Sequence, residues 1–152
     1  MAVAERLAEL GLELPTVAAP AGSYIPAVVS GNLAFTSGQL PTTAGVLPAT
    51  GKVGAEVSAD DAKTYAATCV LNALAAIGSV IGSLDRITRV VKVVGFVSSD
   101  PAFTGQPSVI NGASDLLREI FGDAGVHARS AVGVAVLPLD SPVELELIVE
   151  FA

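Results

Sequence analysis

An arginine and the acids that follow it are the residues of this chain whose types and spacing could do chemistry. Arg129 stands at the start of the apolar segment 129–137, and no lysine or arginine comes after it. Four acids do come after it: Asp140, Glu144, Glu146 and Glu150. A guanidinium can grip a carboxylate through two parallel N–H groups, and a carboxylate beside it can act as a general base. The pattern therefore indicates a site that could hold a small anion next to an activated water.

Two expected strands, over 129–137 and 143–151, must position these groups. Because side chains alternate between the faces of a strand, every second residue from 130 to 136 forms the expected core face of the first strand. Arg129 then lies on the opposite face, and Glu144 lies opposite the core face of the second strand. We expect the two strands to be neighbours, with the cation and the acids together on the open side. Taken alone, the pattern is also typical of a solvated surface or of a weak Arg129–Glu144 ion pair.

Hydrophobic periodicity and turn residues predict one α+β domain over residues 1–152. The expected elements are a short helix over 2–11 and a connecting arm (with 1–18 as an N-terminal extension), strands over 24–29 and 33–37, a surface loop over 42–57, a helix over 59–81, a strand over 87–97, a helix from Asp100-Pro101 to about 121, and the strands over 129–137 and 143–151. Two main helices can cover only one face of a mostly antiparallel sheet. The other face needs a partner, so we expect a homo-oligomer.

The composition argues against several classes of protein. Fifteen acids against eight bases give a net charge of −7, whereas nucleic-acid binding requires a basic face. The first residues lack the pattern of a signal peptide, and no apolar run is long enough to predict a membrane span. We therefore expect a cytoplasmic protein whose partners include neither nucleic acid nor membrane.

The single cysteine and the single histidine do not indicate a metal site, because a structural zinc ion needs four such ligands. Cys69 is expected to be a buried thiol on a helix. His127 is expected to lie in a turn and to be solvated, although its closeness to Arg129 leaves a role in the site open.

Segments in both halves of the chain resemble a known family. In the first half they are Tyr24, Gly31-Asn32-Leu33 and Phe35-Thr36-Ser37-Gly38-Gln39-Leu40-Pro41; in the second half they are Arg129-Ser130-Ala131-Val132, Val134-Ala135, Leu137-Pro138 and Val143-Glu144-Leu145-Glu146. They resemble the Rid family of reactive-intermediate deaminases, also called the YjgF family, many members of which carry the label endoribonuclease L-PSP. The resemblance runs from about residue 19 to residue 151.

The resemblance implies a chorismate-mutase-like α+β fold and a homotrimer whose sheets form a central barrel, with ligand clefts between subunits. The activity it implies is hydrolysis of reactive enamines and imines to 2-oxo acids and ammonia, without cofactor or metal. Two other functions stay open. One is a trimeric protein that binds small carboxylates without catalysis, and the other is an endoribonuclease or translation inhibitor, against which the net charge of −7 weighs.

The resemblance also implies roles for individual residues. Arg129 matches the arginine that binds the substrate carboxylate, and Glu144, 15 residues further on, matches the acid that positions or activates water. Further matches to residues of the ligand cleft are Tyr24, Ser37, Gly38 and Asn111. Ala131 stands where the deaminases commonly have cysteine, so a ligand contact through its backbone N–H is expected while a thiol role is lost. Ala131, the N-terminal helix and the 42–57 loop predict a divergent subgroup.

Overall fold

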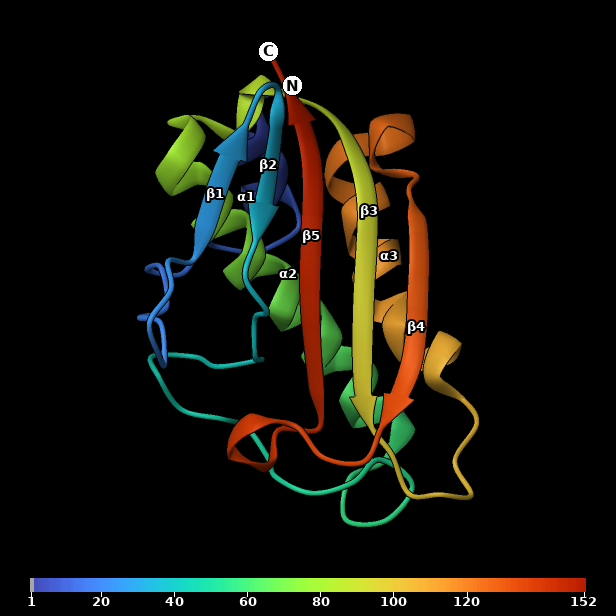
Figure 1. Cartoon of the computed structure of the whole chain (residues 1–152). Helices are drawn as coiled ribbons and strands as arrows, with labels where there is room; N and C mark the ends of the chain where they lie inside the picture. Colours follow the sequence, from blue (N-terminus) through green and yellow to red (C-terminus); the bar gives the residue numbers. More distant parts are fainter. Residues whose placement is uncertain (1) are drawn as a thin grey trace.

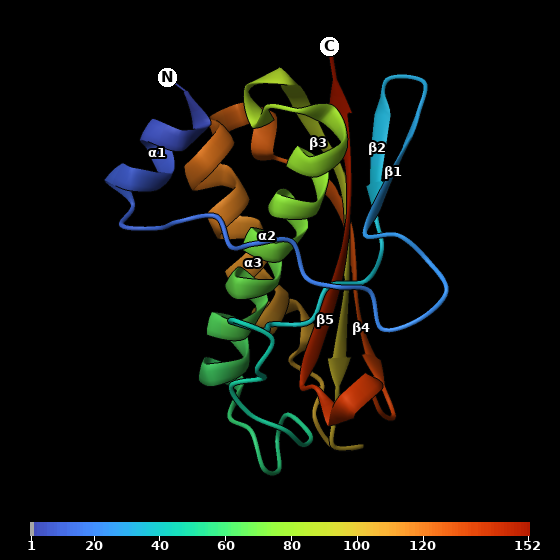
Figure 2. The same ribbon diagram turned by 90° about the vertical axis from the view of Figure 1, so that its left-hand side faces the viewer.

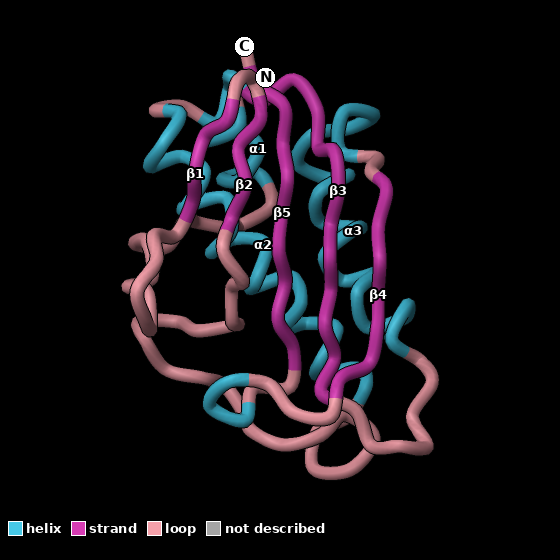
Figure 3. The backbone as a smooth tube through the Cα atoms, in the orientation of Figure 1, coloured by secondary structure: helices cyan, strands magenta, loops and turns pink. Residues whose placement is uncertain are grey.

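Within residues 2–152, which the computed structural model describes, five strands form one mixed sheet (Figures 1 and 3). The strands are β1 (Ala27–Ser30), β2 (Leu33–Thr36), β3 (Ile87–Ser98), β4 (Ala128–Val134) and β5 (Val143–Phe151), in the spatial order β1-β2-β5-β3-β4. Neighbouring strands are antiparallel except β3 and β4. These two run parallel, because helix α3 (Gln106–Phe121) makes the crossover between them.

The α-helices of the described chain all lie on one side of this sheet (Figure 2). They are α1 (Val3–Glu9), α2 (Ala59–Ile81) and α3. The Ser58 Oγ accepts a hydrogen bond from the Asp61 N–H at 3.1 Å and caps α2, and Gly82, with a φ of 88°, ends it. The predicted α+β layout, with the main helices on one face, is confirmed.

The core lies between the sheet and the helices α2 and α3, and its side chains are aliphatic. Its largest fully buried members include Leu74, Ile77, Ile110, Leu117, Leu145 and Leu147. By length and composition alone α2 is apolar enough to cross a membrane, as core helices of globular proteins also can be. In this fold 56% of its most apolar window is buried, which is the environment of a core helix.

The second main helix begins later than predicted. The Asp100 carboxylate accepts a hydrogen bond from the Ala102 N–H at 2.9 Å, which makes a separate turn of the Asp100-Pro101 segment. The helix α3 therefore starts at Gln106, with Pro107 in its first turn, where the missing N–H has no partner to lose.

Other boundaries also differ from the prediction. The strand expected over 129–137 ends at Val134, and the strand expected over 24–29 starts at Ala27. Pro26, which cannot donate to a sheet ladder, immediately precedes that start. The loop over 42–57 is not wholly at the surface, because its valines at 53 and 57 are buried in the core.

The other face of the sheet carries no α-helix of the described chain (Figure 2), and it bears both apolar side chains and the glutamates of β5. The register pairs Val28 with Phe35, and Phe35 with Ile148, so these three side chains form one row across β1, β2 and β5. Val28 is 52% exposed, and Val132 on β4 is 44% exposed. An apolar surface of this kind is typical of an interface with another chain.

Candidate functional site

The face that Arg129 occupies on β4 differs from the prediction. The register places Ala131 beside Gly95 of β3, and a Cβ on that glycine would collide with Ile110 of α3. Ala131, and with it Arg129 two residues earlier, therefore points to the helix face of the sheet. Val132, on the face that was expected to be the core, is 44% exposed. Small residues on the helix face let α3 approach closely, and strand alternation alone does not reveal this.

The Arg129 side chain is anchored by α3. Its Nη1 donates to Asn111 Oδ1 at 2.8 Å and to Ser114 Oγ at 3.1 Å, and its Nη2 donates to the Pro107 carbonyl oxygen at 3.3 Å. The structure thus brings together Arg129 and Asn111, both of which the sequence singled out. The sequence analysis missed Ser114, although its position three residues after Asn111 puts both on one helix face.

Part of the Arg129 guanidinium remains available for a ligand. An arginine has five N–H donors, and the described contacts use two on Nη1 and one on Nη2. One N–H on Nε and one on Nη2 are left, which are enough for a bidentate grip on a carboxylate. The three acceptors carry no charge, and none of the ion pairs among the described residues includes Arg129. The positive charge is therefore held in place without being neutralised.

A hollow of about 400 Å³ lies beside Arg129 at the edge of the sheet, and Ser114, Arg118 and His127 are among the residues that line it. His127 precedes β4 and is half-buried rather than fully solvated. Burial lowers the pKa of His127, and the charge of Arg129 adds to this effect, while the ring's hydrogen bond to the Ala128 carbonyl oxygen opposes it. The imidazole is thus biased toward its neutral form, and the cations of this hollow are the two arginines.

Glu144 lies next to Gly38, and both are residues to which the resemblance gave roles in the ligand cleft. A Cβ built on Gly38 would collide with the Glu144 carboxylate, so the absence of a side chain makes room for it. The segment that contains Gly38 is tied to β5 by two backbone hydrogen bonds between Gln39 and Leu145, at 2.8 and 3.0 Å. The glycine and the carboxylate are therefore fixed relative to each other.

The environment of Glu144 changes its proton affinity. Burial raises the pKa of the Glu144 carboxyl, and the negative charge of Glu146, two residues along the same strand face, raises it further. A carboxylate with a raised pKa is a stronger base than an ordinary glutamate, and its pKa is better matched to proton transfer near neutral pH.

Tyr24 and Ser37 belong to the same region as Gly38. Tyr24 and Gly38 both line one groove of about 690 Å³. The Tyr24 hydroxyl accepts a hydrogen bond from the Ala21 N–H at 3.1 Å, and the residue is 48% exposed. The Ser37 hydroxyl donates to the Ile25 carbonyl oxygen at 2.6 Å, so its proton is already used and only its lone pairs can face a ligand.

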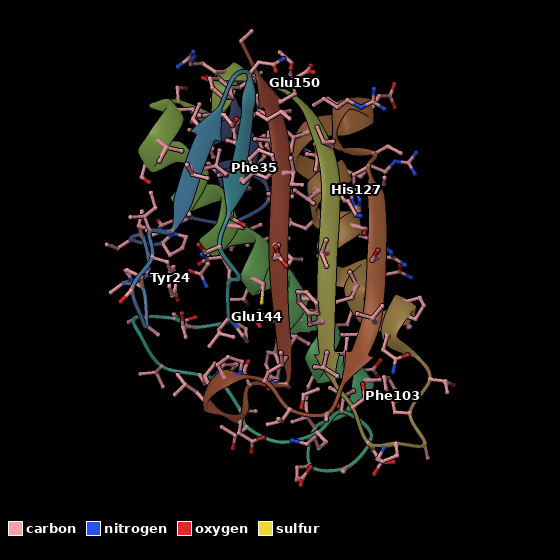
Figure 4. The ribbon with its side chains drawn as sticks, in the orientation of Figure 1. Tyr24, Phe35, Phe103, His127, Glu144 and Glu150 are labelled. Carbon is pink, nitrogen blue, oxygen red and sulfur yellow. The ribbon has the colours of Figure 1, made fainter. Side chains whose placement is uncertain are left out.

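In a single chain the site residues form two groups rather than one. We term Arg129 with Asn111 and Ser114 the arginine half. The glutamate half consists of Tyr24, Ser37, Gly38 and Glu144. Figure 4 shows Tyr24 and Glu144 to one side of β3, and His127, which shares a hollow with Arg129, to the other side.

The sheet topology explains this separation. β3 lies between β4 and β5, so the strands that carry Arg129 and Glu144 are about 10 Å apart. The register aligns Glu144, Phe96 and Val132 in one row on the open face, whereas Arg129 points to α3. The expectation that the two strands are neighbours with the cation and the acids on one face is wrong. An ion pair between Arg129 and Glu144 across neighbouring strands is excluded for the same reason.

Cys69 is fully buried on α2, as predicted. Burial raises the pKa of its thiol well above the ordinary value, and the charge of Glu144 contributes in the same direction. The thiol therefore stays protonated, which is typical of a structural cysteine and unsuited to a nucleophile.

Comparison with known families and proteins places the chain among relatives over nearly its whole length. The family described as "YjgF/chorismate mutase-like, putative endoribonuclease" matches residues 4–151. Protein TCP17 of Trypanosoma cruzi is 44% identical over 149 residues, which are 97% of this chain and 93% of TCP17.

Solved structures show the same similarity. A "putative endoribonuclease" from Shewanella oneidensis is 36% identical, with 99% of this chain and 100% of that chain covered, and the two superimpose with a TM-score of 0.96. TdcF of Escherichia coli, whose crystal structure contains bound serine, is 25% identical, with 91% and 94% of the two chains covered and a TM-score of 0.57. Both comparisons cover more than nine tenths of this chain, and the chain superimposes much more closely on the Shewanella protein than on TdcF.

Proposed function

Because the chain belongs to the YjgF/chorismate mutase-like family, we propose that it hydrolyses reactive enamines and imines of amino acids to 2-oxo acids and ammonia. The reaction takes place in a cleft that two copies complete, the arginine half coming from one copy and the glutamate half from the other. The observation that carries the proposal is a charged arginine with a free bidentate edge, together with a carboxyl of raised pKa on the surface that completes the cleft.

The reaction needs a carboxylate clamp and a group that moves protons. An enamine first takes a proton on carbon, releases one from nitrogen and becomes the imine. Water then adds to the C=N carbon while one of its protons passes to Glu144, and the π electrons of the C=N bond go to nitrogen, which takes up a proton. The amine of the carbinolamine takes up a second proton, its hydroxyl loses a proton, the C=O bond forms, the C–N bond breaks and ammonia leaves. General-base help of this kind contributes about 10²–10⁴-fold.

The bound ligand of a relative supports this class of substrate. The serine in the TdcF structure carries the carboxylate and the 2-amino group whose imine counterpart is the substrate proposed here. Arg129 supplies two N–H groups for such a carboxylate, and α3 holds them in place before a ligand arrives. A clamp that is oriented in advance saves the entropy of ordering a long side chain.

The separation of the two halves supports assembly into a homotrimer. If the arginine half of one copy meets the glutamate half of the next, the contact is head-to-tail. Such contacts form a closed ring when the rotation from one copy to the next divides evenly into a full turn. The open face of the sheet, with the apolar row of Val28, Phe35 and Ile148, would then lie against the other copies and line a central barrel.

One observation favours a second function, the binding of small carboxylates without catalysis. Ala131 offers no thiol on the strand that carries Arg129, and its side chain packs toward the core. An endoribonuclease activity, which the family description names, has less support, because the net charge of −7 and the sequence pI of about 4.5 oppose the approach of RNA.

An assay with 2-aminoacrylate, generated from serine by a dehydratase, tests the proposal. The protein is expected to accelerate the loss of 2-aminoacrylate and the appearance of pyruvate and ammonia. Arg129→Lys keeps the positive charge but removes the paired N–H donors of the guanidinium. The value of kcat/KM should therefore fall about 10- to 100-fold, which is the usual effect of losing hydrogen bonds to a charged group. The same exchange at Arg6 on α1, which belongs to neither half, should leave kcat/KM unchanged.

Two results would change the assignment. If the wild-type protein does not accelerate the loss of 2-aminoacrylate, it is not a deaminase of this substrate class. If calorimetry then detects serine binding that Arg129→Lys abolishes, the protein is a binder of small carboxylates.

A further inference from the structure

We propose that the groove beside Tyr24 takes the side chain of the substrate, so that the protein acts on imino acids with a bulky, uncharged side chain. The inference rests on the proposed function, because it places the reacting carbon of the substrate beside Gly38 and Glu144. It goes beyond that function by naming the part of the chain that selects the substrate.

The groove lies between the N-terminal arm and the segment that follows β2. Its volume is about 690 Å³, and its lining includes Val17 and Ala18 of the arm, Tyr24, and Leu40. None of the described residues that line it carries a charge. A charged substituent would lose its hydration there without gaining a partner, whereas an apolar one would be stabilised by burial.

Both walls of the groove are held by hydrogen bonds. Asn72 of α2, which is 2% exposed, donates from Nδ2 to the carbonyl oxygens of Leu40 and Thr42 at 3.0 and 2.9 Å. On the other side, the Ala21 N–H of the arm donates to the Tyr24 hydroxyl. The groove is therefore formed in advance by the arm and by α2, as small-molecule sites usually are.

The groove is continuous with the glutamate half. Gly38 lines the groove, and its missing side chain is what makes room for the Glu144 carboxylate. A substrate carbon that water attacks beside Glu144 thus lies at the mouth of the groove, and the substituent on that carbon extends inward. A volume of about 690 Å³ is within the usual range for small-molecule sites and exceeds what a methyl group fills.

The test measures kcat/KM for imino acids made in place from alanine, leucine and phenylalanine by an L-amino-acid oxidase, with semicarbazide trapping the imine that remains. The imines of leucine and phenylalanine should be hydrolysed with a kcat/KM at least about tenfold above that of the alanine imine. Val17→Asp places a charge in the groove, and Ala18→Trp fills it. Each should lower the phenylalanine-to-alanine ratio of kcat/KM about tenfold or more.

Val46→Asp is the matched control, because Val46 is 67% exposed, lies in the nearby loop and does not line the groove. It should leave both kcat/KM values unchanged. Equal kcat/KM values for all three imines, or a ratio that Val17→Asp and Ala18→Trp do not alter, would overturn the inference while leaving the deaminase function in place.

If no imine is hydrolysed, the proposed function fails. Calorimetry with the amino acids themselves then tests whether the groove binds a side chain. Tighter binding of phenylalanine than of alanine, weakened by Val17→Asp but not by Val46→Asp, would support the groove as a side-chain pocket. Binding without such a preference, or no binding at all, would overturn it.

Discussion

At the scale of single residues, the way Arg129 is held matters as much as its presence. Its three hydrogen-bond acceptors on α3 are an amide, a hydroxyl and a carbonyl, all of them neutral. A carboxylate in their place would anchor the side chain equally well, but it would neutralise the positive charge that attracts an anionic ligand. The arrangement therefore positions the guanidinium and leaves its charge available.

Gly38 makes room for the Glu144 carboxylate, and a substitution tests this directly. Gly38→Ala should displace the flexible carboxylate rather than the backbone, so kcat should fall about tenfold or more while the Tm stays close to that of the wild type. Gly78→Ala on α2 is the control, because its Cβ would make ordinary contacts at 3.7 Å with Leu84. In a helix that change should stabilise the fold by about 0.5–1 kcal/mol and leave kcat unaltered.

The raised pKa of Glu144 predicts how activity depends on pH. Glu144 acts as a base only when deprotonated, so kcat should fall as the pH drops through its pKa, which burial and Glu146 hold above the ordinary value of 4.5. Glu146→Gln removes the like charge and leaves the burial. The acid limb of the pH–kcat profile should therefore move to lower pH but remain above the ordinary value. A limb that stays in place, or moves to higher pH, would contradict the role of Glu144 as the base.

At the scale of elements, α3 is the part of the fold that orients the Arg129 guanidinium. It reaches Arg129 because the facing positions of β3 and β4 are small: a Cβ on Gly95 would collide with Ile110, and one on Gly133 would crowd Gln106. Both partners of these contacts lie on α3. The small residues thus let α3, with Asn111 and Ser114, pack against the edge strand β4.

Asn111→Ala tests α3 as a positioning element. Loss of the amide acceptor should raise KM about 10- to 100-fold with a smaller effect on kcat, since the hydrogen bond orients a charged group rather than taking part in the chemistry. Asn111→Asp keeps an acceptor but neutralises Arg129, so it should raise KM as well while keeping the side chain in place. A KM unchanged in Asn111→Ala would show that Arg129 does not depend on this helix.

At the scale of the whole molecule, the proposed cleft between two copies of the chain can be tested directly. Arg129→Ala and Glu144→Gln should each abolish activity in a pure assembly. When the two variants are unfolded together at equal amounts and refolded, about a quarter of the wild-type activity should return, because in a head-to-tail ring one interface in four joins an intact arginine half to an intact glutamate half. Size-exclusion chromatography with light scattering checks that the mixed assemblies have the wild-type mass.

The same mixture distinguishes a site between two copies from a site within one chain. A site within one chain would be damaged in every copy, so mixing would restore nothing. Mixing also controls for misfolding, since a variant that could not fold would not complement its partner.

The sequence by itself determined which main helices and strands form. The bounds of α2 and β5 followed from capping residues and local periodicity, and the core face of β5 followed from its alternation of apolar and acidic residues. These signals are local, which is why they can be read without a fold. Tertiary structure alone decided which strands are neighbours, which face of β4 packs on α3, and hence that Arg129 and Glu144 cannot meet within one chain. Alternation tells which residues share a face, but close packing against a distant helix decides which face is covered.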